Sequence, residues 1–297
     1  MSKFISWDDQ RLFLAVLEEG SLSAAARKLG MSQPTVRKRL ECLESALGTT
    51  LFTRSVNGLS PTRKAIGLQD AAMKMALASD LFIRQASTEA GETSGTVRLS
   101  VPEFMGIEVV PSILTQLHAK HPDLHIELEL SNRPANLLEQ EVDIAIRTVA
   151  PHQDALVAQK VMPRPLAFYA SKEYLARKGV PQTLADFSKH SLIGPDRNLR
   201  DLAFAAGFDP HFTPASLALR CDSHPAQLAA ARAGFGICIA QTLVGDDDPN
   251  LQRLLPDFTV ATLDVWVVMH EDLRDEPRVR SVFNCLVTHL TAKTKAH

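Results

Sequence analysis

The sequence has 297 residues, more than a usual single domain, which predicts two or three hydrophobic cores. Its hydrophobic content of 45% and charged content of 22% are ordinary for a globular protein. It holds no apolar run long enough to span a bilayer, and Met1-Ser2-Lys3-Phe4 does not begin a signal peptide, so we expect a cytoplasmic protein without membrane contact. The net charge of −2 is uneven: residues 1–90 hold 12 Lys or Arg against nine Asp or Glu, and residues 91–297 hold 20 against 25.

Two short helical patterns follow each other near the N-terminus. The first runs from about Ser21 to Leu29, carries three alanines where two helices can approach closely, and ends at Gly30. Ser32 is predicted to cap the second helix, and Pro34 suits its first turn, where a missing amide proton costs little. Helical spacing predicts a buried face made of Val36, Leu40, Leu43 and Leu47.

The opposite face of the second helix is polar and basic, with Gln33, Pro34, Arg37, Lys38 and Glu41. Such a division is typical of a helix that reads base edges in the major groove. A hairpin is predicted next, from strands at residues 51–54 and 59–61 with an Asn57-Gly58 turn, and it would place Arg54 beside the DNA backbone. Between Arg27 and Lys64 there are eight Lys or Arg and two Glu, which favours DNA binding over a merely solvated basic helix.

These segments carry a resemblance to a known family. Trp7-Asp8-Asp9, the Gly20 to Ala26 segment, Ser32-Gln33-Pro34-Thr35-Val36 and the Leu47 to Arg54 segment resemble LysR-type transcriptional regulators. The resemblance implies that the DNA-binding residues are Ser32, Gln33, Pro34, Thr35, Arg37, Lys38 and Arg54. The family often has a small Ser where Arg37 stands, so the base preference there is expected to be unusual. Dimers, and tetramers built from dimers, are implied as well.

A long helix is expected from a Thr62 cap to about Ala86. Leu68, Met75 and Phe82 repeat every seven residues with small residues between them, like the seam of a coiled coil. Two interpretations stay open: the seam packs on its own DNA-binding domain, or it joins two copies of the chain. We favour the second, because recognition of two half-sites needs two DNA-binding domains. The polar stretch over residues 87–95 is the predicted hinge.

From residue 95 onward, short apolar strands alternate with helical segments, and over residues 96–147 this alternation predicts βαβ order with a parallel sheet. Strands are expected at 96–101, 125–130, 143–147, 166–170, 191–193, 216–221, 236–240 and 263–269, and helices at 107–120, 135–140, 172–178, 225–233 and 277–290. The family resemblance implies two lobes of the periplasmic-binding-protein kind (type 2), crossed by the chain near residues 163–165 and 264–266.

The expected fold class is therefore α+β and multidomain: a winged helix-turn-helix with a long linker helix, followed by a two-lobed α/β effector domain. The expected bounds are 1–62 for the DNA-binding domain, 63–94 for the linker, and 95–297 for the effector domain. Within the latter, lobe I would span about 95–163 and 267–297, and lobe II about 164–266.

Ligands of open α/β sheets bind beyond the carboxyl ends of strands, near helix N-termini. This rule selects four loops that would converge on one cleft, although each residue in them has an alternative role as a cap, an ion-pair partner or a solvated side chain. The candidate effector-binding residues are Ser100, Pro102, Glu103, Phe104, Arg147, Thr148, Asp196, Asn198, Asp222, Ser223 and His224. Because Glu103 would repel an anion close to Ser100, an effector with a positive or neutral polar end, or one kept away from Glu103, is left open.

The expected partners are a double-stranded DNA operator, a small-molecule effector and further copies of the chain; contact with RNA polymerase is left open. Cofactors and metals are not expected, since the sequence lacks clustered ligands, a nucleophile elbow, a P-loop and a dinucleotide fingerprint. The competing class, an enzyme or a plain small-molecule binding protein, would not need the basic reading head. Cys42, Cys221, Cys238 and Cys285 are scattered and predicted to be reduced, with a Cys221–Cys238 redox pair as the less favoured alternative.

Overall fold

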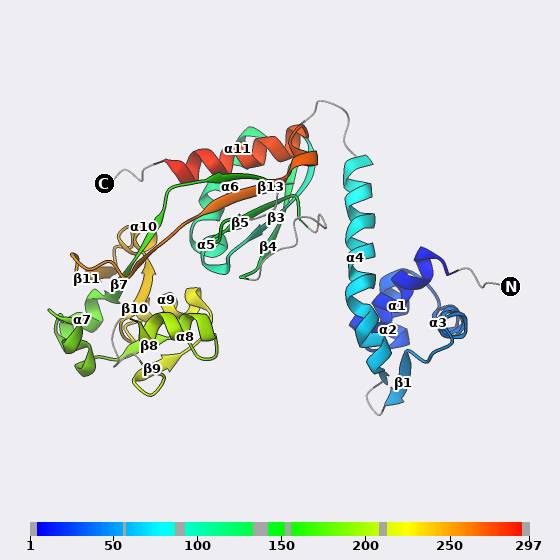
Figure 1. Cartoon of the computed structure of the whole chain (residues 1–297), viewed down its shortest axis with the longest axis horizontal. Coiled ribbons are helices and arrows are strands. Elements are labelled where there is room, and N and C mark those ends of the chain that lie inside the picture. The colour runs from blue at the N-terminus through cyan, green and yellow to red at the C-terminus, as the bar shows by residue number, and fades with distance from the viewer. Residues whose placement is uncertain are drawn as a thin grey trace. The chain divides into compact units, whose positions relative to one another are not determined.

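The computed structural model describes residues 5–55, 58–86, 93–132, 142–151, 156–207 and 213–292. The chain divides into two compact units, one reaching Ser87 and one holding nearly all that follows (Figure 1). The helix predicted over 135–140 and the Val56-Asn57 part of the predicted turn lie outside the described residues. Within the described ranges, no helix is both long enough and apolar enough to cross a membrane.

The first unit holds a helical trio, a hairpin and a long helix. Its elements are α1 (Trp7–Glu19), α2 (Leu22–Leu29), α3 (Gln33–Leu47), β1 (Phe52–Ser55), β2 (Gly58–Pro61) and α4 (Arg63–Ala86). A serine caps each of the first three helices, and a left-handed glycine ends each one, as at Ser21 and Gly30 for α2. The predicted helix-turn-helix and hairpin are thereby confirmed, and local sequence explains where the helices stop.

The core of this unit lies between the three helices and the hairpin. Val36, Leu40 and Leu43 are buried there as predicted, together with Leu12 and Phe13 of α1. The prediction for Leu47 was wrong, because its side chain is 41% exposed. Leu47 closes the last turn of α3, and the next residue, Gly48, already leaves the helix.

In its described residues the second unit contains two larger sheets, one in each lobe, and a small two-stranded sheet. The first lobe has a five-stranded sheet in the order β4-β3-β5-β13-β6. Its strands are β3 (Gly95–Val101), β4 (Leu124–Leu130), β5 (Ile144–Arg147), β6 (Leu156–Lys160) and β13 (Trp266–His270). β3 is parallel to β4 and β5, but β13 is antiparallel to both β5 and β6. The parallel order predicted for the strands over residues 96–147 is therefore confirmed, and β13, which returns from the other lobe, enters the sheet in the opposite direction.

The second lobe is centred on β7 (Arg164–Ser171). This strand pairs antiparallel with β10 (Cys238–Gln241), β11 (Leu251–Leu254) and β12 (Ala261–Leu263). Among the described residues of this lobe, β8 (Leu192–Gly194) pairs parallel with β9 (Leu217–Arg220), and a parallel bridge joins Leu192 to Ile237. Its helical elements are α7 (Lys172–Lys178), η2 (Leu184–Lys189), α8 (Leu199–Ala206), α9 (His224–Arg232) and α10 (Thr242–Gly245). Strands β6, β11 and β12 and the helical elements η2, α8 and α10 were not predicted.

The chain passes between the lobes twice, along β6 to β7 and along β12 to β13 (Figure 1). Near the crossing the two passages are bonded to each other: the Val161 amide donates to the Val265 carbonyl at 2.9 Å, and Arg164 pairs with Leu263. The crossings therefore lie close to the predicted positions.

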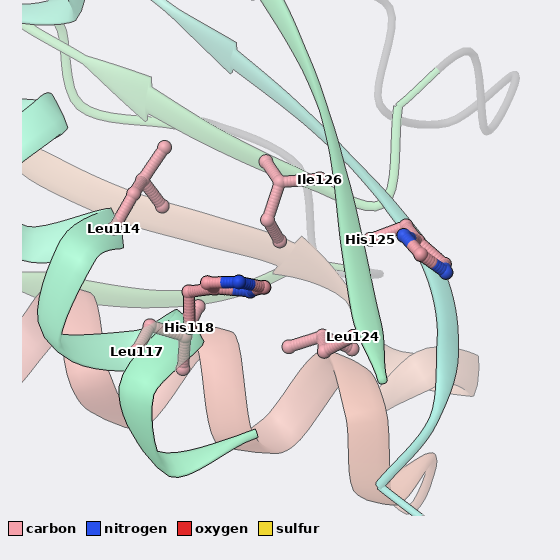
Figure 2. Close-up of a pocket in the computed structure, with 6 residues that line it drawn as sticks. All are labelled: Leu114, Leu117, His118, Leu124, His125 and Ile126. Atoms are coloured by element: carbon pink, nitrogen blue, oxygen red, sulfur yellow. The ribbon is translucent and has the colours of Figure 1, made fainter. Parts of the chain in front are cut away.

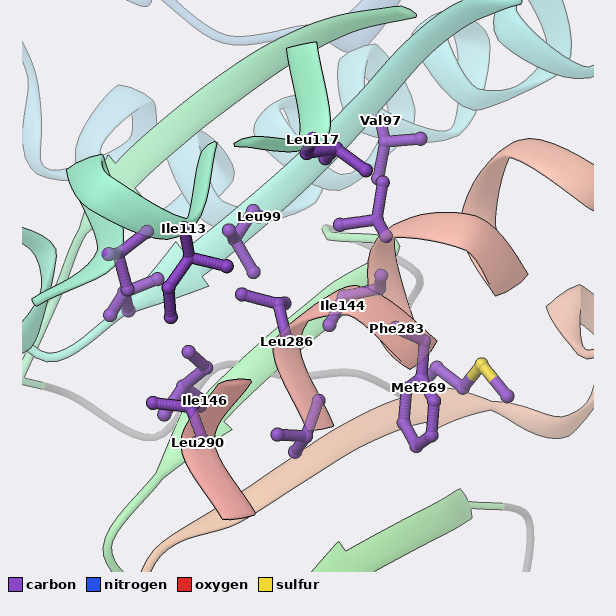
Figure 3. Packing of buried hydrophobic residues seen from close by; sticks show 14 of the residues in the cluster. Val97, Leu99, Ile113, Leu117, Ile144, Ile146, Met269, Phe283, Leu286 and Leu290 are labelled. Carbon is purple, nitrogen blue, oxygen red and sulfur yellow. The ribbon is translucent and has the colours of Figure 1, made fainter. Parts of the chain in front are cut away.

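The core of the first lobe packs α6 (Val110–Lys120) and α11 (Pro277–Thr291) on the sheet. Figure 3 shows Ile113 and Leu117 of α6 and Leu286 of α11 facing the strand residues Leu99 and Ile144. The helix predicted over 107–120 is interrupted, since α5 (Glu103–Glu108) ends before Val109 and α6 starts afresh. Pro111 in the first turn of α6 explains the restart, because proline cannot donate the hydrogen bond that would continue α5.

Candidate functional site

Helix α3 separates an apolar from a polar face along its whole length. Ser32, Gln33, Pro34, Thr35, Arg37 and Lys38 are all exposed, as predicted for a face that meets DNA. The Ser32 hydroxyl accepts the Thr35 amide at 3.3 Å and lies 2.7 Å from the Thr35 hydroxyl, which fixes the first turn. The buried side anchors the helix, so that the polar side chains project from a rigid element.

Two cations on this face, Arg37 and Lys38, form no ion pair with a described residue, although Glu41 lies on the same face. Arg39, in contrast, donates to Asp9 at 2.7 Å and belongs to the scaffold. Arg37 and Lys38, with Gln33, Pro34 and Glu41, line a shallow groove of about 370 Å³. Unpaired cations beside amide and hydroxyl donors are suited to phosphates and base edges.

The hairpin is held against the helical trio by one close backbone contact. Gly58 has a φ of +123°, and a Cβ there would clash with the Gly20 carbonyl, which also accepts the Leu59 amide at 2.9 Å. Glycine is therefore required at this position. Arg54 pairs with Leu59 through the backbone of β1 and β2, but its side chain is not among the described residues.

Helix α4 presents apolar side chains to solvent as well as to its own unit. Thr62 caps it as predicted, accepting the Ala65 amide at 3.3 Å. Of the predicted seam, Leu68 is partly buried against the first unit, whereas Met75 is 42% and Phe82 73% exposed. Leu68 thus fits the interpretation in which the seam packs on its own domain, whereas no described residue covers Met75 and Phe82.

In the first lobe, Ser100 and Arg147 are held together at the ends of β3 and β5. Ser100 is fully buried, and the Arg147 guanidinium donates to its hydroxyl at 2.8 Å and to its carbonyl at 3.1 Å. Thr148, which follows Arg147, is half-buried. The structure therefore brings the two residues together as predicted for one loop cluster, and Ser100 serves first to position the arginine.

Helix α5 lies between the two lobes. Glu103, in its first turn, accepts the Ser223 hydroxyl of the second lobe at 3.0 Å, and Pro102 occupies its cap position. Phe104 is buried in the core of the second lobe, beside Tyr169. Phe104 therefore packs in the core and does not line an open cleft as predicted. Glu103 and Ser223, in contrast, form a hydrogen bond between the two lobes.

The second-lobe loop over residues 196–198 points its amides at a carboxylate of the same chain. Asp222 accepts the amides of Asp196, Arg197 and Asn198 at 2.9 to 3.2 Å, and these bonds lower the pKa of Asp222. Asn198 in turn caps α8. A backbone nest of the kind that binds anions is therefore already filled by Asp222.

His224 stands among several carboxylates. Its Nε2 lies 3.2 Å from Asp201, and this contact raises the pKa of His224 against the opposing effect of burial, with smaller contributions from Glu103 and Asp222. Folding therefore favours the protonated ring. The stabilisation is complete below the unfolded pKa near 6.5 and is lost as the pH rises through the higher folded pKa.

The raised pKa of His224 predicts how stability depends on pH. Replacing His224→Gln should lower the free energy of unfolding more at about pH 6 than at about pH 9, as measured by urea denaturation. His190→Gln is the matched control, because burial lowers the pKa of His190 and its contribution should change with pH in the opposite sense. Parallel pH trends for both variants would contradict the assignment.

A pocket of about 250 Å³ opens elsewhere in the first lobe, between α6 and β4. Figure 2 shows Leu117 and His118 on the helix and Leu124 and Ile126 on the strand. None of the predicted effector-binding residues lines it. Within the described ranges, no three His, Cys, Asp or Glu side chains are grouped to hold a metal ion.

The cysteines form no disulfide in the structure. Cys238 is fully buried, and burial raises its pKa to about 12, which disfavours the reactive thiolate. Cys221 is half-buried and Cys42 is exposed. This environment supports the reduced, inert assignment for Cys238 over the redox pair.

Arg232 of α9 was not predicted from the sequence to have a role. It binds Glu108 of α5 through two hydrogen bonds of 2.8 Å and Asp248 at 2.6 Å, and so joins the two lobes. No local pattern marks this contact, because its partners are 124 and 16 residues away. Trp266 was also missed; it pairs with Arg147 across β13 and β5.

Comparison with known proteins decides the family. Residues 7–65 match the family model described as a bacterial regulatory helix-turn-helix protein of the lysR family, and residues 90–291 match the LysR substrate binding domain. The chain belongs to the LysR family of transcriptional regulators. Its two units therefore hold a DNA-binding domain and an effector-binding domain.

Full-length LysR-family proteins are similar to this chain throughout. An HTH-type transcriptional regulator of Xanthomonas campestris pv. campestris is 25% identical over 296 residues, covering 95% of this chain and 85% of its own. The HTH-type transcriptional activator TtdR of Escherichia coli K12 is 23% identical over 278 residues, covering 92% and 89%. Both relatives are named as transcriptional regulators.

Solved structures share the fold. Full-length CbnR complexed with its target DNA superposes with a TM-score of 0.70 at 18% identity, covering 96% of this chain and 99% of that one. CrgA of Neisseria meningitidis, a LysR-type regulator, gives a TM-score of 0.60 at 24% identity, covering 98% and 100%.

Proposed function

We propose that this LysR-family protein binds an operator sequence-specifically through α3. Gln33, Pro34, Arg37 and Lys38, flanked by Ser32 and Thr35, would enter the major groove, and Arg54 on the hairpin would contact a phosphate. The observation that carries the proposal is the exposed face of α3, where unpaired cations and an amide surround a shallow groove above a buried apolar face. Relatives with a matching helix-turn-helix domain are transcriptional regulators.

We further propose that two copies pair through α4, with Met75 and Phe82 at the contact, and that such dimers assemble into tetramers. Pairing would bring two reading heads to two half-sites. The support is the exposure of both side chains on a helix whose other face is already packed.

A small-molecule effector is proposed to bind where the lobes meet and to change DNA binding through the relative positions of the domains. The support is the convergence of Ser100, Arg147, Glu103 and Ser223 from both lobes near the ends of β3 and β5. Thr148, Asp196, Asn198, Asp222 and His224 would surround them. This role is binding and not catalysis.

Substitutions in the reading head test the proposal. Gln33→Ala should weaken operator binding by about 1 to 3 kcal/mol with little change on random duplex, because a bidentate amide contact discriminates among bases. Arg54→Ala should weaken both duplexes alike and reduce the salt slope by about one unit, as for one lost phosphate contact. Titrations use an operator selected by the protein from a random library, a scrambled duplex and several salt concentrations.

Glu18→Gln provides the control, since its carboxylate pairs with Lys28 away from α3 and should alter neither affinity nor specificity. An equal loss on both duplexes for Gln33→Ala would remove α3 from base recognition.

A further inference from the structure

The two carboxylates of α3 are used in different ways. Glu44 is half-buried, and its Oε1 accepts the amides of Leu51 and Phe52 at 2.6 and 3.1 Å, so it holds the start of the hairpin. Glu41 is exposed and has no hydrogen bond or ion pair with any described residue. The described scaffold therefore uses Glu44 and leaves the carboxylate of Glu41 available.

The cations of α3 divide in the same way. Arg39 is paired with Asp9 at 2.7 Å, whereas Arg37 and Lys38 have no ion pair in the described part of the chain. Glu41 follows Arg37 by four residues and Lys38 by three, spacings at which ion pairs commonly form on a helix, yet no ion pair joins it to either one. Three charged side chains of α3 thus remain free to contact a partner.

These three side chains lie on one stripe of the helix. Pro34, Arg37, Lys38 and Glu41 follow each other at positions i, i+3, i+4 and i+7, which share one helical face. The same four residues and Gln33 line the shallow groove of about 370 Å³. Homeodomain recognition helices contact DNA through four residues at this same spacing. A helix in the major groove can therefore bring a residue of its third turn, as Glu41 is here, to the base edges.

The chemistry of a carboxylate limits what Glu41 can contact on DNA. An ionised carboxylate only accepts hydrogen bonds, and phosphates repel it. The donors in the major groove are the cytosine N4 and adenine N6 amino groups. Adenine places the acceptor N7 beside its amino group, whereas cytosine presents no acceptor there. The guanine paired with that cytosine presents two acceptors, O6 and N7, which suit a neighbouring arginine or lysine.

We infer that Glu41 accepts a hydrogen bond from the N4 amino group of a cytosine in the operator and thereby determines the base preference at that position. Arg37 or Lys38 would bind the guanine of the same base pair. On other bases the carboxylate would add repulsion without a hydrogen bond, which disfavours the wrong sequences as well. The inference rests on the proposed reading role of α3 and names one feature of the operator.

Selection from a random duplex library, with the full chain and with Glu41→Ala, provides the first test. The parent should select a cytosine at one position of each half-site, and Glu41→Ala should lose that preference while keeping the preferences at the other positions. Glu41→Ala should also bind a scrambled duplex at least as tightly as the parent, because it removes a negative charge beside the phosphates. Glu18→Ala is the matched control, an exposed carboxylate on α1 that pairs with Lys28, and it should select the sequence of the parent.

Removal of one amino group from the DNA tests the contact itself. The selected cytosine is replaced by 2-pyrimidinone, which keeps the ring and lacks the N4 amino group. The parent should lose roughly tenfold in affinity, as for one hydrogen bond to a charged group, whereas Glu41→Ala should lose no more than about twofold on the same duplex. The loss shared by both proteins measures the weaker base pair, so the difference between them reports on Glu41 alone.

Three results would overturn the inference: an unchanged cytosine preference in Glu41→Ala, equal effects of Glu41→Ala on the selected and scrambled duplexes, or equal losses of the two proteins on the 2-pyrimidinone duplex. Gln33→Ala distinguishes these from failure of the proposed function. If Gln33→Ala loses selectivity and Glu41→Ala keeps it, the role of Glu41 alone is wrong. If the parent selects no sequence, the proposed function fails and the inference fails with it.

Discussion

Phe82→Glu is expected to split the proposed dimer into monomers. Phe82 is 73% exposed in the isolated chain, so a charge there costs little in the monomer. In a paired helix it would become an uncompensated buried ion, weakening association by several kcal/mol, roughly 3 to 5. Sedimentation velocity at micromolar concentration measures the mass, and Met75→Glu should act in the same direction.

Gln69→Glu is the matched control for the dimer prediction, because it adds the same charge to an exposed position of α4 outside the Met75–Phe82 stripe. It should leave the mass unchanged. If Phe82→Glu and Met75→Glu both keep the native mass, α4 does not form the contact between copies.

Arg232→Met is expected to lower the free energy of unfolding by roughly 2 to 3 kcal/mol. The substitution leaves Glu108 and Asp248, 14% and 10% exposed, without their cation. Burial is the largest influence and raises the pKa of Asp248, but the bond and charge of Arg232 together with the amides of Asn250 and Leu251 make the net shift downward, so the loss of Arg232 should raise the pKa of Asp248. The estimate lies below that of a fully buried pair, since Arg232 is 34% exposed. Urea denaturation measures the change.

Two further variants serve as controls for the Arg232→Met measurement. Lys189→Met breaks an exposed pair with Asp186 and should cost no more than about 0.5 kcal/mol. Adding Glu108→Gln and Asp248→Asn to Arg232→Met removes the uncompensated charges and should recover part of the loss. A loss for Arg232→Met as small as that for Lys189→Met would show that the triad does not hold α5 to α9.

Local sequence predicted most of the first unit. The predicted caps at Ser21 and Ser32 and the predicted stop at Gly30 depend on hydrogen bonds and backbone angles within a few residues. Family resemblance added the two-lobed plan, which matches the sheets and their two crossings. The loops selected for the effector came from strand order, and Ser100 and Arg147 do lie together.

The tertiary structure decided how the polar residues of those loops are used. Asp222 accepts the backbone amides of residues 196–198, and Phe104 packs into the second lobe. From the sequence alone, both residues had been predicted to contact a ligand. Strand β13 runs antiparallel, and its Trp266 meets Arg147 from 119 positions further along the chain. The sequence by itself determined α2, α3 and α4 and the exposed polar face of α3, because those follow from short-range periodicity and local caps. Partners distant in the chain were fixed by packing, which no local pattern encodes.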